Sequence, residues 1–422
     1  MVRAFLVSVI LLPTQVVLSP AQTPSGPQVR ADVEFLTADR LEGRGTGYPG
    51  AEAAAEYIGQ RFEAIGLRQV PGLGGWFQSY QISATAPAIH GSEVGGRNAR
   101  NVVALLPGQD ARLAGDYLVI GAHYDHLGLG GGGSLDPDSV GVVHNGADDN
   151  ASGVAALLEI ARQLSAAPPA RSVLFVAFSG EELGLLGSTA FVKASPVPMD
   201  RVVAMLNFDM VGRLRDDKLI VNGVETATEF RPVLDSLNRT FGFSLTATGG
   251  GYGPSDHAAF TPVGRPVLHF FTGTHQEYHR TTDDAPLINV EGIQRIASFA
   301  AAATKSLGDR RHVLTFVASA APRPATSGSR TGGYGAWLGT IPDMSETPGG
   351  VRISGLSEGS PGQKGGLLAG DIITRIGTHE VPDLQSMTDA LRAHVAGDLV
   401  DIVVLRDGKP QVFQVTLGQR GG

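Results

Sequence analysis

The sequence predicts an α/β protein with a mostly parallel central sheet, helices on both faces, and a small, mainly β domain after it. Two observations predict this class. Apolar, β-branched runs alternate with helical patterns up to about residue 306, which is typical of a parallel sheet covered on both faces. Residues 320–333 then become rich in Ala, Pro and Ser, as in a linker.

The first domain begins with a helical pattern in residues 31–67. Its apolar positions are Ala53, Ala54, Tyr57, Ile58, Phe62 and Ile65. Buried strands are predicted at residues 102–106, 117–122, 173–178, 202–208 and 267–271. Helices are predicted around residues 154–164 and 230–237, and a last one over 290–306 closes the domain.

Beyond the linker, strand patterns surround one short helix. The strands are predicted at residues 350–356, 372–376, 400–406 and 411–417, and the helix buries Leu384, Met387 and Leu391. We place the first domain at residues 30–308, the linker at 309–333 and the second domain at 334–420.

Composition excludes several classes of protein. Apolar residues make up 42% and charged residues 18%, as in an ordinary globular chain rather than a disordered or multi-span membrane protein. The net charge of −8 without a basic block argues against binding nucleic acid. The chain has no cysteine, so disulfides, thiolate zinc sites and a thiol nucleophile are excluded. Any metal must be bound by histidines and carboxylates.

Residues 1–21 are typical of a secretory signal peptide. Arg3 precedes the apolar run 4–12, and Ser19 and Ala21 are small residues at a cleavage site. The alternative, a membrane anchor, needs about 20 unbroken apolar residues, and Pro13 interrupts this run. We expect cleavage after Ala21, a secreted or periplasmic protein, and no membrane span in the mature chain.

Candidate metal ligands follow the predicted strands, at the edge where open α/β sheets bind ligands. They are His123, Asp125, Glu181, Glu182, Asp209 and His279. Asp148 and Asp149 lie in the loop before the helix predicted around residues 154–164. Because His123 and Asp125 are two residues apart, they should project the same way. Histidines and carboxylates without thiols suit a divalent metal. The two histidines and three of the carboxylates would make five ligands, which is more than one tetrahedral zinc needs. Two zinc ions that share an Asp would account for all five.

Other interpretations of these residues exist. A single Asp or His after a strand is often a cap or a hydrogen-bond partner, and Asp148 or Asp149 could cap the helix that begins near Ser152. Adjacent Glu181 and Glu182 are harder to explain, because two buried carboxylates repel each other unless a cation is near. The glycine runs at 130–133 and 249–251 are predicted to be loops, since neither has the lysine of a phosphate-binding loop.

Five segments in order resemble the bacterial di-zinc leucyl-aminopeptidase-like metallopeptidases. They are residues 121–128, 145–153, 178–184, 207–210 and 278–283. This is the twenty-eighth metallopeptidase family, in the clan shared with glutamate carboxypeptidase and the transferrin receptor. The resemblance covers about residues 30–305, and residues 36–44 resemble the family's opening segment.

The resemblance implies a site for two zinc ions. The implied terminal ligands and the bridging ligand are His123, Glu182, Asp209, His279 and, as the bridge, Asp149. The family's register selects Asp149 rather than Asp148, and implies a cis peptide bond between Asp149 and Asn150. The same resemblance makes Glu181 the general base, Asp125 the carboxylate that orients His123, and Tyr278 a hydroxyl donor to the oxyanion.

Residues 334–418 resemble a PDZ domain of the kind appended to bacterial proteases. Residues 336–339 correspond to its carboxylate-binding loop and residues 360–373 to its most recognisable stretch. The loop departs from the usual Gly-Leu-Gly-Phe. The resemblance implies a groove for a peptide C-terminus, and the alternative is a docking domain whose groove binds nothing.

Together these patterns predict a zinc-dependent exopeptidase, an aminopeptidase that releases apolar residues from peptides with a free N-terminus. A carboxypeptidase, a dipeptidase or a glutaminyl cyclase on the same scaffold are the catalytic alternatives, although the cyclases use one zinc. The alternative outside catalysis is a scaffold that has lost its metals and binds through the PDZ domain. Its ligand set should be broken, whereas this one is complete.

Overall fold

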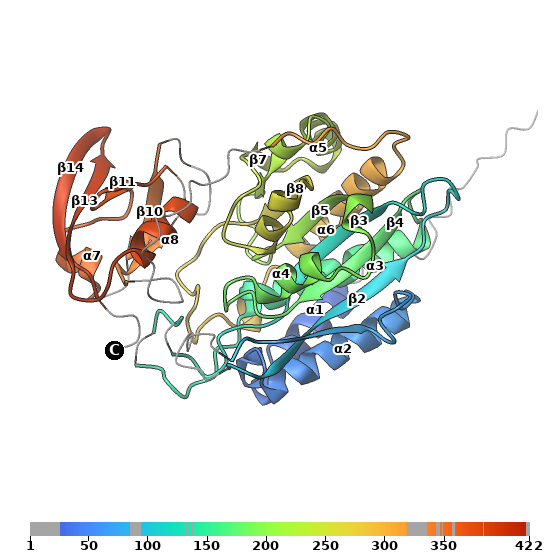
Figure 1. Cartoon of the computed structure of the whole chain (residues 1–422), viewed down its shortest axis with the longest axis horizontal. Coiled ribbons are helices and arrows are strands. Elements are labelled where there is room, and N and C mark those ends of the chain that lie inside the picture. The colour runs from blue at the N-terminus through green and yellow to red at the C-terminus, as the bar shows by residue number, and fades with distance from the viewer. Residues whose placement is uncertain are drawn as a thin grey trace, which may run out of the picture.

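The computed structural model describes residues 26–84, 94–131, 133–136, 138–318, 336–342, 347, 349–356, 359–382 and 384–418. The predicted signal peptide at 1–21 and linker residues 319–333 lie outside this part of the chain. An α/β body and a smaller β body are visible in Figure 1. The predicted fold class is confirmed.

The first body is built on an eight-stranded sheet in the order β1-β2-β4-β3-β5-β8-β6-β7. Its strands are β1 (Phe77–Gln81), β2 (Asn98–Leu106), β3 (Tyr117–His123), β4 (Ser172–Phe178), β5 (Val202–Phe208), β6 (Lys218–Asn222), β7 (Ser244–Thr248) and β8 (Val267–Phe271). The four central strands β4, β3, β5 and β8 are parallel. Strands β1 and β2 join antiparallel on one side, and β6 pairs antiparallel with β8 on the other.

Helices cover both faces of this sheet (Figure 1). They are α1 (Gly26–Leu36), α2 (Pro49–Ile65), α3 (Gly153–Ala166), α4 (Leu186–Lys193), α5 (Phe230–Phe241) and α6 (Val290–Gly308). Successive strand residues point to opposite faces, so Ile120 joins the core beneath α1, α2, α3, α5 and α6, while Val119 joins a second core beneath α4. Within the described chain, no helix has the length and apolar character needed to cross a bilayer.

The structure divides the predicted opening helix into two. Between α1 and α2 lies a tight turn, Asp39–Arg44, in which Glu42 and Arg44 have positive φ values of 46° and 51°. The sequence pattern missed β1, β6, β7 and α4. All four are short: β1, β6 and β7 have five residues each and α4 has eight, and β1 also carries partly exposed polar residues.

The second body is a small sheet with two short helices. Its elements are β9 (Thr340–Pro342), β10 (Val351–Leu356), α7 (Pro361–Lys364), β11 (Ile372–Ile376), β12 (His379–Glu380), α8 (Leu384–Arg392), β13 (Leu399–Arg406) and β14 (Lys409–Thr416). The strand order is β14-β13-β11-β10-β9, with β12 paired to β11. Alternating residues such as Ile402 and Val404 are fully buried and form a core distinct from those of the first body.

Because the two bodies have separate cores, a chain ending at residue 333 should fold without the second body. We expect a cooperative thermal transition and the same zinc content per chain as the full protein. Circular dichroism and metal analysis of the truncated chain measure both quantities. Aggregation or loss of metal would show that the second body is part of the first body's structure.

Candidate metal centre

The parallel strands deliver the candidate ligands to one edge of the sheet. His123 is the last residue of β3, Glu182 follows β4, and Asp209 follows β5 directly. Strands β4, β3 and β5 are adjacent and parallel, so their carboxyl ends meet at the same edge. Asp149 comes from the turn before α3, and His279 from the segment after β8.

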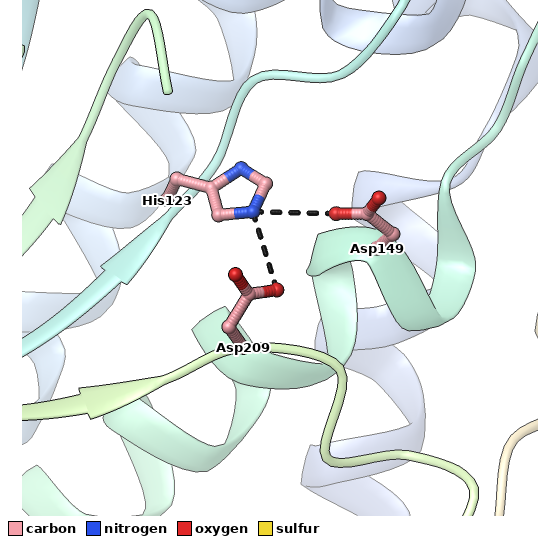
Figure 2. Close-up of side chains that lie close together, drawn as sticks. All are labelled: His123, Asp149 and Asp209. Carbon is pink, nitrogen blue, oxygen red and sulfur yellow. Dashed lines mark ion pairs between the residues drawn. The ribbon is translucent and has the colours of Figure 1, made fainter. Parts of the chain in front are cut away.

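One half of the site consists of His123, Asp149 and Asp209 (Figure 2). The Nε2 atom of His123 lies 3.2 Å from Oδ1 of Asp149 and 3.4 Å from Oδ1 of Asp209. All three side chains are largely buried. The three ligand atoms therefore face one point.

The other half of the site uses the second oxygen of Asp149. Nε2 of His279 lies 3.0 Å from Oδ2 of Asp149 and 3.3 Å from Oε2 of Glu182. Each oxygen of Asp149 thus faces one pair made of an imidazole and a carboxylate. This is the arrangement of a carboxylate that bridges two metal ions.

These separations fit zinc. Ligand atoms about 2.0–2.1 Å from a tetrahedral ion are about 3.3 Å apart, and the four separations lie between 3.0 and 3.4 Å. The donors are imidazole nitrogens and carboxylate oxygens, which zinc accepts. The five predicted ligands are thus brought together in a geometry that suits two ions.

The turn Ala147–Ser152 fixes the direction of Asp149. Its Asp149–Asn150 peptide bond is cis, as predicted. Oδ2 of Asp283 accepts the backbone N–H groups of Asp148 and Asp149, at 2.9 and 3.1 Å. The side chain of Asn150 bonds to the carbonyl of Phe208 and to the N–H of Met210, which ties the turn to the end of β5.

Asp148 points elsewhere. Its Oδ1 accepts hydrogen bonds from Ser152 and from the N–H of Gly212, and its Oδ2 lies 3.1 Å from Nε2 of His275. His275 in turn lies 3.1 Å from Glu277. Asp148 therefore belongs to a buried polar network beside the site, and the geometry agrees with the register that selects Asp149.

The other predicted site residues lie close to these ligands. The N–H of Glu181 donates to Oδ1 of Asp125, 3.2 Å away, and Thr46 donates to the other oxygen of Asp125 at 2.8 Å. Nδ1 of His123 contacts Asp125 chiefly through its main-chain carbonyl, at 3.2 Å, with the carboxylate 3.7 Å away. The ring of Tyr278 stacks on His279 with 3.9 Å between centroids.

Hydrogen bonds behind the ligands fix their orientation. Nδ1 of His279 donates to the carbonyl of Gly133 at 2.9 Å, which leaves Nε2 for a metal. Ser255 donates to Oδ2 of Asp209 at 2.6 Å and itself accepts from Asn207. Each of these ligands has a group that sets its direction.

The crowding of charges shifts the pKa values of the histidines. Burial lowers the pKa of His123, but Asp209 and the other carboxylates around it outweigh burial and raise it well above 6.5. Burial acts the same way on His279, and its neighbours Glu182 and Asp149 raise its pKa to about 10. Without metal, both imidazoles therefore hold a proton at neutral pH.

The two glutamates differ. Burial raises the pKa of Glu181 well above its ordinary value, and the charge of Glu182 raises it further against the opposing effect of His123. Burial also acts to raise the pKa of Glu182, but His279 and His126 lower it well below the ordinary value. Glu182 is therefore an anion beside two imidazoles, while Glu181 is a carboxylate with high proton affinity.

Sequence reasoning gave no role to several residues that support the site. His126 contacts Glu182, Ser255 contacts Asp209, and Asp283 supports the turn of Asp149. Arg44 is fully buried, and its guanidinium donates to main-chain carbonyls on both sides of the site. Their contacts are between residues far apart in the chain. The one available signal was that most of them lie inside or beside the recognised motifs.

With this geometry in place, comparison with known families decides the classification. Residues 101–304 match the description "Peptidase family M28", and residues 337–417 match "PDZ domain". The chain carries an M28 peptidase domain followed by a PDZ domain. The predicted family and the predicted C-terminal PDZ domain are confirmed.

Relatives of the M28 domain are named as peptidases. The chain is 32% identical to aminopeptidase YwaD of Bacillus subtilis over 201 residues, which are 44% of this chain and 40% of the relative. It is 26% identical to leupeptin-inactivating enzyme 1 of Streptomyces exfoliatus over 258 residues, 60% of this chain and 50% of the relative. The chain thus spans half or less of these two relatives.

Solved structures share the fold of the M28 domain. A zinc aminopeptidase from Bacillus subtilis covers 67% of this chain and 95% of its own, with a TM-score of 0.54 and 17% identity. A glutaminyl cyclase from Porphyromonas gingivalis covers 67% and 98%, with a TM-score of 0.54 and 18% identity. Relatives of this domain are named as an aminopeptidase and a zinc aminopeptidase, which agrees with the predicted enzyme class.

The raised pKa values predict that metal binding releases protons. A zinc ligand must be a neutral imidazole, so His123 and His279 must each lose a proton when the ions bind at neutral pH. We expect release of at least about two protons per chain, and weaker binding as the pH falls. Calorimetric titration of the metal-free protein in two buffers of different ionisation enthalpy measures the number. A His123→Asn variant should release about one fewer, and a release near zero in the unaltered protein would contradict the charge state described here.

Proposed function

We propose that this chain is a zinc-dependent aminopeptidase whose two zinc ions act together on the peptide bond. The observation that carries the proposal is Asp149, whose two oxygens each face an imidazole–carboxylate pair. A single-ion site would need one such pair. The names of the relatives support the choice of peptide hydrolysis among the reactions of this fold.

Bound zinc would polarise the substrate carbonyl and lower the pKa of a bound water to about 7. The protein's own groups do the rest. The backbone N–H of Glu181 donates to Asp125, which fixes the position of this residue. The high proton affinity of its carboxylate suits it to take a proton from the attacking water and return it to the leaving amine. Tyr278, stacked on His279, is the proposed hydroxyl donor to the oxyanion.

The charges around the site favour a free amine over a free carboxylate as the recognised end of the substrate. Four carboxylates, those of Asp149, Glu181, Glu182 and Asp209, balance two zinc ions. A carboxypeptidase would also need a cation for the substrate's terminal carboxylate. Among the described residues beside the site, three arginines already have partners: Arg44 bonds to main-chain carbonyls, Arg213 pairs with Glu277 and Arg280 pairs with Asp136. This supports recognition of a free amine rather than a carboxylate.

An apolar pocket beside the ligands supports a preference for apolar residues. It has a volume of about 150 Å³, and Glu182 and His126 line it. Its apolar walls come from Tyr48, Val94, Leu127, Leu129 and Leu183. A dry cavity of about this size binds a molecule as large as benzene, so a leucine side chain would fit. We propose that the substrate residue released from the N-terminus is apolar.

The remaining proposals concern location and the PDZ domain. The pattern of residues 1–21 supports secretion or a periplasmic location. A PDZ domain indicates peptide binding, and we propose that its groove binds a peptide C-terminus.

The first test is hydrolysis of matched peptides with free and acetylated N-termini. We expect release of the first residue from the free peptides, faster for Leu than for Asp or Lys, and loss of activity with a chelator. Metal analysis of the zinc-saturated protein should give two ions per chain. Equal cleavage of blocked peptides would contradict the aminopeptidase, and one ion per chain would contradict the zinc pair and favour a cyclase.

A pair of isosteric variants separates the adjacent glutamates. Glu181→Gln removes the base but no ligand, so both zinc ions should remain while kcat falls by ~10²–10⁴-fold or more. Glu182→Gln removes an anionic ligand, so one zinc should be lost first. Zinc content and turnover of both variants at fixed zinc check this. If Glu181→Gln loses a metal and Glu182→Gln keeps both, the two functions are reversed.

A further inference from the structure

The side chain of His126 touches each of the three segments that form the second half of the metal site. Its Nδ1 lies 2.9 Å from Oε1 of Glu182. Its ring meets the ring of His279 edge-on, with 5.7 Å between centroids. It also packs against Gly146, three residues before Asp149. Neither the predicted ligand set nor the proposed mechanism uses this histidine.

The direction of the hydrogen bond to Glu182 follows from the chemistry of the partners. A carboxylate only accepts, so Nδ1 of His126 carries the hydrogen and donates it. Oε1 of Glu182 is thereby held by His126, while Oε2 is the oxygen that faces His279 at 3.3 Å. The bond therefore selects which oxygen of Glu182 is presented to a metal.

Two features of the structure accommodate the ring of His126: a glycine at position 146 and a buried Nε2 without a hydrogen-bond partner among the described residues. A Cβ on Gly146 would lie 2.4 Å from Cγ and 2.5 Å from Cδ2 of His126, so the loop before Asp149 is shaped around the imidazole. Nε2 is buried and has no hydrogen-bond partner among the described residues. A leucine would fill the space without burying an unpaired nitrogen. Stability alone therefore does not explain a histidine here.

We propose that His126 is a positioning residue for the second metal ion, the one that Asp149, Glu182 and His279 would bind. Its Nδ1–H holds Oε1 of Glu182 so that Oε2 remains aligned for the metal. The inference rests on the proposed zinc site. It concerns the second ion, because ligand atoms of His126, Asp149 and Glu182 lie within 4.8 Å of one another, whereas the group around the first ion is His123, Asp149 and Asp209.

Two nearly isosteric variants test the hydrogen bond. Asn places its amide nitrogen close to the position of Nδ1 and can still donate to Glu182, whereas Leu has the same shape without a donor. Metal-free protein is titrated with Zn²⁺ against a chromogenic chelator, which measures both binding constants without any substrate. We expect His126→Leu to weaken the second ion by ~10–100-fold, as for other groups that orient metal ligands, and to leave the first unchanged. His126→Asn should stay within a few-fold of the unaltered protein.

A matched control is His257→Leu. His257 is also buried in the first domain, but its ring stacks on His269, with 4.6 Å between centroids. This variant should bind the second ion normally, and circular dichroism verifies that each variant folds. If His126→Leu does not fold, His126→Ala removes the donor in its place.

Three results would overturn the inference. The donor-free variant could bind the second ion with unchanged affinity. His126→Asn could lose as much affinity as His126→Leu, which would make the imidazole a metal ligand. The control could weaken the second ion equally. A single ion in the unaltered protein would contradict the proposed zinc pair instead, and the response of that ion to the His126 variants would still decide the function of His126.

Discussion

The constraint on which the rest of the structure depends is the burial of several like charges in one small space. Asp149, Glu181, Glu182 and Asp209 are each at most 9% exposed, and they lie beyond adjacent parallel strands. Carboxylates this close repel one another, and burial adds a desolvation cost. Such a cluster persists only beside cations, which are the protonated His123 and His279 in the metal-free protein and would be divalent ions once metal replaces those protons.

Much of the surrounding structure stabilises this cluster. The guanidinium of Arg44 donates to main-chain carbonyls, those of Tyr124, Asn145 and Gly146, at 2.8, 2.7 and 3.0 Å. Burial lowers the pKa of Arg44 to about 10, and the nearby carboxylates, Asp125 first, act to keep it charged. One buried cation therefore joins the end of β3 to the loop before Asp149 and also offsets the negative charge of the site. The tight turn at residues 39–44 positions it.

The fold and the donor set answer different questions about function. The same scaffold is found in a zinc aminopeptidase and in a glutaminyl cyclase at equal TM-scores, so the fold alone does not select the reaction. The selection rests on side chains: two imidazole–carboxylate pairs around Asp149, the adjacent base Glu181, and arginines already engaged elsewhere. These features are the basis for proposing a substrate with a free amine. The proposed aminopeptidase activity therefore rests on local chemistry more than on topology.

The sequence by itself determined the central strands, the residues that follow them, and the two domains, because buried strands and their carboxyl ends leave a local pattern of apolar runs and polar breaks. The five candidate ligands were found this way, together with motif resemblance. The register of the family resemblance selected Asp149 over Asp148, but only the tertiary structure shows that Asp148 faces His275 instead and that His126 touches Glu182. Strands β1, β6 and β7, each of only five residues, were missed as well. The Asp148–His275 and His126–Glu182 contacts join residues 127 and 56 positions apart, and periodicity within a short window does not reveal such pairs.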